Sequence, residues 1–164
     1  MQNLPDMNRI KVSKDFSLDE FIPPEIYDRF EAHALMWIRP EIISIAQELR
    51  NLFGRTIINN WSAGGNNSPE EFFSFDKALQ KGFFTESGLR LPVTTTGAKY
   101  SMHKFGCAAD LKFVHVSLDE VRNYIVQHYK SRFQTLGLTR MENNTPSWLH
   151  VDIANTNCTN LIVF

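Results

Sequence analysis

Residues 101–110 read SMHKFGCAAD, and they form the most informative stretch of the chain. His103 and Asp110 stand on either side of Gly106, a glycine whose position predicts a turn into a strand. Side chains placed in this way can face a common cavity. Zinc accepts imidazole and carboxylate ligands, and a catalytic zinc usually has three protein ligands and one open position. The stretch therefore supplies two candidate metal ligands and requires a third.

The candidate for the third ligand lies late in the chain, where residues 148–152 read WLHVD. These residues predict a strand, in which alternate side chains share a face. His150 is therefore expected on the same face as Trp148 and Asp152. We predict a zinc site formed by His103, Asp110 and His150.

The segments around these residues predict an α+β domain. We expect helices over about 25–36, 40–53 and 118–133, a further helix starting at Ser68, and strands over 55–61, 106–113, 138–141, 148–153 and 161–164. Prolines, glycines and Ser-x-x-Glu capping boxes bound these segments. Strands and helices segregate without a repeating βαβ order, which favours a small, mostly antiparallel sheet with helices packed on it.

Length and composition fit a single domain over residues 1–164, with 1–15 as an extended N-terminal segment. The formal net charge of -1 provides no general attraction for nucleic acid, so we expect none as a partner. No apolar run approaches the roughly 18 residues of a membrane span, and we expect no signal peptide. Cys107 and Cys158 are too few and too isolated for a disulfide framework, so we expect two free thiols.

Beyond single residues, the sequence contains the pattern S-x-H-x-x-G-x-A-x-D followed by W-x-H. This pattern resembles the peptidase family of zinc D-Ala-D-Ala carboxypeptidases and phage endolysins, which has the hedgehog signalling domain as a distant structural relative. The fixed positions of the first motif are matched by Ser101, His103, Gly106, Ala108 and Asp110. The resemblance covers roughly Phe16 to Ile153, and the segments 16–21, 58–61 and 88–90 look like the phage-encoded branch of the family.

The resemblance implies a hedgehog/D,D-peptidase-like fold, a bound Zn²⁺ and a peptidoglycan stem peptide as substrate. Both a D,D-carboxypeptidase and an endopeptidase fit it. A phage-type enzyme of this kind would be made in the cytoplasm and would act on the cell wall after lysis release or as part of a phage particle. A monomer is favoured.

A zinc peptidase needs a carboxylate that takes a proton from water and passes it to the leaving amine. Members of the family have an acidic residue shortly before the last histidine, and Glu142 is the acidic residue between Met141 and His150. Asp152 is the rival candidate, because it shares a strand with His150. It can instead hold a ligand imidazole in place.

Substrate contacts are predicted for Arg90, Ser101 and Trp148. A guanidinium offers a fork of donors that matches a carboxylate, and the family has an arginine ahead of the zinc histidine that does similar work. Arg90 could also cap a strand end or pair with Glu86. Ser101 is expected to bind substrate or the metal ligands, and the walls of the cleft are expected to include Trp148, Tyr100 and Trp61.

A second class of function stays open from the sequence. The chain could be a catalytically inactive binding or virion structural module that keeps the zinc site, as the hedgehog relative illustrates. The position of Glu142 relative to the three ligands separates the two readings, because a general base must reach the attacking water.

Overall fold

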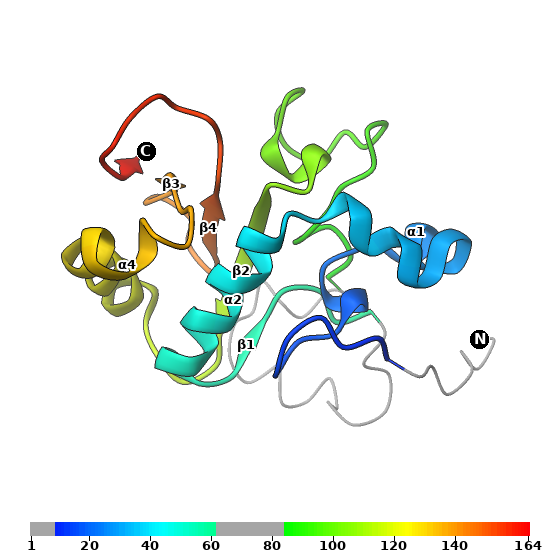
Figure 1. Cartoon of the computed structure of the whole chain (residues 1–164), viewed down its shortest axis with the longest axis horizontal. Helices are drawn as coiled ribbons and strands as arrows, with labels where there is room; N and C mark the ends of the chain where they lie inside the picture. Colours follow the sequence, from blue (N-terminus) through cyan, green and yellow to red (C-terminus); the bar gives the residue numbers. More distant parts are fainter. Residues whose placement is uncertain (1–8, 62–83) are drawn as a thin grey trace.

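Five short strands form one sheet in the part of the chain that the computed structural model describes, residues 9–61 and 84–164 (Figure 1). The strands are β1 (Thr56–Ile57), β2 (Ala108–Phe113), β3 (Arg140–Met141), β4 (Leu149–Asp152) and β5 (Ile162–Val163). Their order in the sheet is β1-β2-β4-β3-β5. Neighbours run antiparallel except β3 and β5, which are parallel. The α+β prediction is confirmed, and the sheet is mixed.

Helices and single turns precede or connect these strands in the described part of the chain. They are η1 (Leu18–Glu20), α1 (Pro24–Phe30), η2 (Glu31–Trp37), α2 (Pro40–Phe53), η4 (Met102–Phe105), α4 (Leu118–His128) and η5 (Tyr129–Phe133). The predicted helix over 25–36 is wrong in its second half. Glu31 has a φ of 46°, which an α-helix cannot contain, and the chain continues from there as the 3-10 helix η2. The helix expected to start at Ser68 lies outside the described residues.

Helix α2 matches its prediction and packs against the sheet (Figure 1). It begins with a proline at its first position, and the backbone turns at Gly54, where φ is 78°. Phe53, at its last turn, contacts both Phe113 of β2 and Tyr124 of α4, with ring centroids 5.9 and 5.3 Å apart. The apolar side of α2 thereby joins α4 and the sheet in one core. The buried residues of α2 are Ile42, Ile43, Ile45, Ala46 and Leu49.

Side-chain alternation gives the sheet two different faces. On β2, Ala109 and Leu111 are buried in the apolar core, so Asp110 points to the opposite face. On β4, Leu149 and Val151 are in the same core, so His150 and Asp152 point away from it. One face of the sheet thus closes the core, and the other carries the polar side chains.

The strand predicted over 55–61 is shorter than expected. After Ile57 the chain leaves the sheet, because its polar groups find partners elsewhere. The backbone N–H of Asn59 donates to the carbonyl of Glu20, and the side chains of Asn59 and Trp61 donate to the carbonyl of Ile22 at 3.2 and 2.8 Å. Trp61 is therefore a core residue with 7% of its surface exposed.

At the N-terminal side, residues 9–15 fold back on the domain. Lys11 forms an isolated antiparallel bridge with Ser17, and Arg9 makes an ion pair of 2.8 Å with Asp19. Both cysteines are free thiols, as predicted. Among residues 9–61 and 84–164, every helix is too short or too polar to cross a lipid bilayer.

Candidate metal centre

His103 lies on the short helix η4, directly before the chain enters β2. The turn between the two elements is made by Gly106, with a φ of 65°. A side chain at this position would place its Cβ 1.7 Å from the carbonyl oxygen of Trp37, so only glycine fits. His103 is 1% exposed, and its Nδ1 lies 2.7 Å from the carbonyl oxygen of Gly88.

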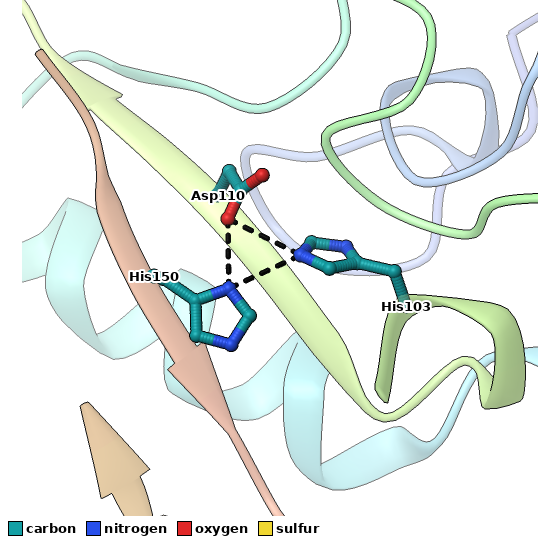
Figure 2. Close-up of side chains that lie close together, drawn as sticks. All are labelled: His103, Asp110 and His150. Atoms are coloured by element: carbon teal, nitrogen blue, oxygen red, sulfur yellow. Dashed lines mark hydrogen bonds and ion pairs between the residues drawn. The ribbon is translucent and has the colours of Figure 1, made fainter. Parts of the chain in front are cut away.

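Asp110 and His150 face each other across β2 and β4 (Figure 2). They are direct cross-strand partners, and the alternation of the strands puts both on the polar face of the sheet. His150 Nδ1 lies 2.9 Å from Asp110 Oδ1, and His103 Nε2 lies 3.2 Å from the same oxygen. The two histidine nitrogens are 3.1 Å apart. One helix turn and two strands thereby bring three donor atoms together.

The outer nitrogen of each imidazole fixes which nitrogen faces the centre. A carbonyl oxygen only accepts hydrogen bonds, so His103 donates from Nδ1 to Gly88 and turns the lone pair of Nε2 inward. His150 Nε2 lies 3.1 Å from Asp152 Oδ2 and donates to that carboxylate, so the neutral ring, the form that binds a metal, turns the lone pair of Nδ1 inward. Two lone pairs and a carboxylate oxygen therefore converge on one point, an arrangement that favours a cation.

The dimensions of this triangle suit a metal ion. Donors about 2.0–2.1 Å from a tetrahedral ion lie about 3.3–3.4 Å from one another. The observed separations of 2.9, 3.1 and 3.2 Å are within a few tenths of an ångström of that value. The side chains of His103, Asp110 and His150 are 1, 11 and 12% exposed. The structure thus brings the three predicted ligands together in a group that could hold a metal ion.

Without a metal ion, a proton on His150 balances the negative charge of the neighbouring carboxylates. Burial opposes the charge of His150, but Asp110 and Asp152 outweigh it and raise the pKa of His150 to about 9. Burial also works against ionisation of Asp110, yet the two histidines hold its pKa well below its usual range. Behind Asp110, burial lowers the pKa of Lys112 to about 8, although Asp110 partly offsets the effect. Its ammonium donates to Ser87 Oγ at 2.5 Å and to two backbone carbonyls.

Arg90 contacts the centre through its carboxylate ligand. Nη2 of Arg90 donates to Asp110 Oδ2 at 2.8 Å, and Nε donates to the backbone carbonyl of Glu86 at 2.7 Å. Asp110 thus offers one oxygen to the histidines and the other to the guanidinium. The remaining nitrogen, Nη1, lies against Gly97, and both residues line a cavity.

A cavity of about 570 Å³ opens onto the three donors. Its lining contains the three predicted substrate contacts, Arg90, Ser101 and Trp148, together with Glu142 and the exposed ring of Tyr100. Trp61 was expected in this wall, and that expectation is wrong, because its indole is held in the core by the carbonyl of Ile22. Sequence reasoning missed other lining residues, among them Thr96, Met102, Arg140 and Phe164.

The two candidate bases occupy different positions. The backbone N–H of Glu142 donates to the carbonyl of His150, so the hairpin of β3 and β4 sets Glu142 beside this ligand, and Glu142 lines the cavity. Asp152 is 0% exposed and is not part of the lining. Its Oδ1 accepts from Arg140 and from the backbone N–H of Ala154, and its Oδ2 accepts from Arg140 and His150.

The chain was compared with known protein families, curated proteins and solved structures. No protein family, no curated protein and no solved structure matches the chain. Function must therefore be argued from the side chains of the site.

Proposed function

We propose that the chain is a zinc-dependent peptidase that cleaves stem peptides of peptidoglycan. The observation that carries this proposal is the convergence of two imidazole lone pairs and one carboxylate oxygen, all within 3.2 Å of one another, at a cavity that Glu142 also lines. The motif that supplies His103 and Asp110 resembles a family of cell-wall peptidases, and that resemblance selects the substrate class.

The donor set favours zinc over the other common ions. Mg²⁺ and Ca²⁺ prefer six or more oxygen ligands, whereas zinc takes mixed nitrogen and oxygen ligands and needs few of them. His103, Asp110 and His150 match the three protein ligands of a catalytic zinc site. Zinc bound there would polarise a carbonyl group and lower the pKa of water from about 15.7 to about 7.

Glu142 is the proton carrier in this proposal. It takes a proton from the water that attacks the scissile carbonyl carbon, and it returns that proton to the leaving amine as the C–N bond breaks. Its exposure to the cavity and its place beside His150 support this role. The contacts of Asp152 support the other role considered for it, because a carboxylate that is fully buried and bonded on both oxygens cannot receive a proton from substrate water.

Arg90, Ser101 and Trp148 form the substrate contacts. Arg90 uses two nitrogens to hold the site itself, so a substrate carboxylate or carbonyl would meet the remaining Nη1. Trp148 and Tyr100 provide flat surfaces for the peptide at the cavity wall. Both trimming of a terminal D-Ala and cleavage within the stem fit these contacts. The resemblance to phage-encoded enzymes supports action at the cell wall, after lysis release or as part of a phage particle.

The test is digestion of purified peptidoglycan, with the released fragments identified by mass spectrometry. We expect the wild-type protein to release peptide fragments with zinc and to lose this activity with a chelator. Glu142→Gln keeps shape and most hydrogen bonds but cannot accept a proton, so it should retain zinc and lower kcat by about 10²- to 10⁴-fold. Glu25→Gln, at an exposed carboxylate of α1, is the matched control and should be fully active.

The results separate the proposal from its rival. Zinc-loaded wild-type protein that binds peptidoglycan without releasing any fragment would support the inactive binding or structural module. A fully active Glu142→Gln variant would assign the proton transfer to another residue.

A further inference from the structure

Arg140 lies on β3, directly opposite Asp152 of β4. Direct cross-strand partners share a face of the sheet, so the two side chains meet without a bend in either strand. Arg140 Nε lies 2.8 Å from Asp152 Oδ1, and Nη2 lies 2.7 Å from Oδ2. This is a two-pronged contact in which a planar guanidinium fixes both the position and the rotation of a carboxylate.

Asp152 connects this arginine to the candidate metal centre. Its Oδ2 accepts from Nε2 of His150 at 3.1 Å, the nitrogen that faces away from the other two donors. Asp152 is 0% exposed, whereas the side chain of Arg140 is 31% exposed at the edge of the cavity. A buried carboxylate needs a counter-charge, and Arg140 supplies the guanidinium that contacts it. The contacts form a chain from Arg140 through Asp152 to His150.

We propose that Arg140 is a positioning residue of the candidate metal centre, which holds Asp152 in the orientation that fixes the ring of His150. The proposal rests on the function proposed above and deepens it. Arg90 provides the parallel on the other ligand strand, where a guanidinium holds the outer oxygen of Asp110. Each strand-borne ligand of the site is then held by an arginine, directly for Asp110 and through a carboxylate for His150.

A purely structural ion pair would behave differently from a positioning pair. Removal of a structural pair lowers the free energy of unfolding but leaves the bound metal unchanged. Removal of a positioning contact changes how the metal is bound, even in protein that stays folded. Loss of a hydrogen-bonding partner that orients a metal ligand typically weakens metal affinity by about 10- to 100-fold.

The experiment measures metal affinity and ligand geometry in folded protein. Zn²⁺ is titrated against a competing chelator, and the visible absorption of Co²⁺-substituted protein reports the coordination geometry. We expect Arg140→Gln to weaken Zn²⁺ binding by about 10- to 100-fold and to alter the Co²⁺ spectrum. Arg140→Lys keeps the charge and one donor, and it should recover part of the affinity. The matched control is Arg132→Gln, which removes an arginine that pairs with Glu48 and does not line the cavity.

A double-mutant cycle asks whether Arg140 acts through Asp152. If it does, Arg140→Gln combined with Asp152→Asn should bind Zn²⁺ no more weakly than Asp152→Asn alone. Fully additive losses would overturn the proposal. So would wild-type affinity and an unchanged Co²⁺ spectrum in Arg140→Gln.

A separate readout keeps this inference distinct from the proposed function. If the wild-type protein binds no metal, the proposed function fails, but the tautomer of His150 can still be read by ¹⁵N NMR. At a pH at which the ring of His150 is neutral, we expect its Nε2–H form in wild-type protein and a mixture of tautomers in Arg140→Gln. An unchanged Nε2–H form in folded Arg140→Gln would show that Arg140 does not position this ring.

Discussion

The two histidines of the candidate centre are held in different ways. His103 sits on a 3-10 turn and is fixed by a backbone carbonyl, that of Gly88. His150 sits on a strand and is fixed by the side chain of Asp152, which Arg140 holds in turn. A backbone contact cannot be removed by changing the residue that makes it, whereas a side-chain contact can. The His103 side of the site therefore depends on the path of the chain, and the His150 side depends on individual residues.

Among the changes considered, loss of either histidine should have the largest effect on zinc binding. We expect wild-type protein to carry about one zinc per chain, and His103→Ala or His150→Ala to abolish tight binding, because two protein ligands remain from three. Zinc should also raise the melting temperature of the wild-type protein by binding only the folded state. Metal analysis and thermal unfolding with and without chelator measure both effects. Full zinc content in the two variants would contradict the ligand assignment.

The backbone-held side can be broken at Gly106. Gly106→Ala places a Cβ against the carbonyl of Trp37 at a positive φ, and we expect the free energy of unfolding to fall by on the order of 4 kcal/mol or more. Gly54 provides the matched control, since its φ is also positive but nothing lies within 4 Å of an added Cβ. Gly54→Ala should lower the free energy of unfolding by only about 1–3 kcal/mol, the cost of backbone strain alone. Urea unfolding of both variants measures the difference, and equal losses would mean that strain alone explains the Gly106 result.

A change at Arg90 tests Asp110, the ligand that contacts both histidines, because Arg90 holds the outer oxygen of this carboxylate. Arg90→Lys keeps the charge but replaces the three nitrogens of a planar fork with a single ammonium nitrogen. One nitrogen cannot take the places of Nη2 on Asp110, Nε on the Glu86 carbonyl and Nη1 towards substrate. We expect kcat/KM on a carboxylate-ended peptide to fall by about 10-fold or more, with zinc affinity changed less. Steady-state kinetics and zinc titration measure the two quantities. Unchanged kinetics would remove Arg90 from the substrate contacts.

Much of this site could be predicted from sequence because its chemistry is local. His103, Gly106 and Asp110 lie within eight positions, and glycine between them leaves few alternatives for the turn. Arg140 was missed because its partner is on another strand, and composition does not reveal which residues of two strands face each other. The register of β3 and β4 supplies that information, and it also explains how Glu142 reaches the side of His150.

One error in the fold has the same origin, and a second concerns a helix. β-branched residues predicted a strand through Trp61, but the polar groups of residues 59–61 bond to the backbone of Glu20, Ile22 and Phe84 instead. A proline start likewise predicted a helix to about residue 36, but the chain turns at Glu31, where φ is 46°. The early end of the strand depends on contacts between distant segments, which local patterns do not contain.

Protonation of His150 offers a smaller test of the side-chain-held half. In protein kept free of metal by a chelator, the pKa of His150 is raised from an ordinary value of 6.5 to about 9, so its protonated form favours the folded state. This contribution is complete below about pH 6.5 and is lost as the pH rises towards 9. The free energy of unfolding should therefore fall by about 1–2 kcal/mol between pH 6.5 and 8. The window ends at pH 8 because the lowered pKa of Lys112, about 8, begins to act in the opposite direction above it.

His150→Gln cannot take up the proton, so its stability should change less over this range. Zinc should reverse the trend in wild-type protein, because metal and proton compete for the same nitrogen and the metal binds more tightly as the pH rises. Urea unfolding at several pH values, with chelator and with zinc, measures all three curves. A chelated wild-type protein whose stability is flat between pH 6.5 and 8 would show that Asp110 and Asp152 do not hold a proton on His150.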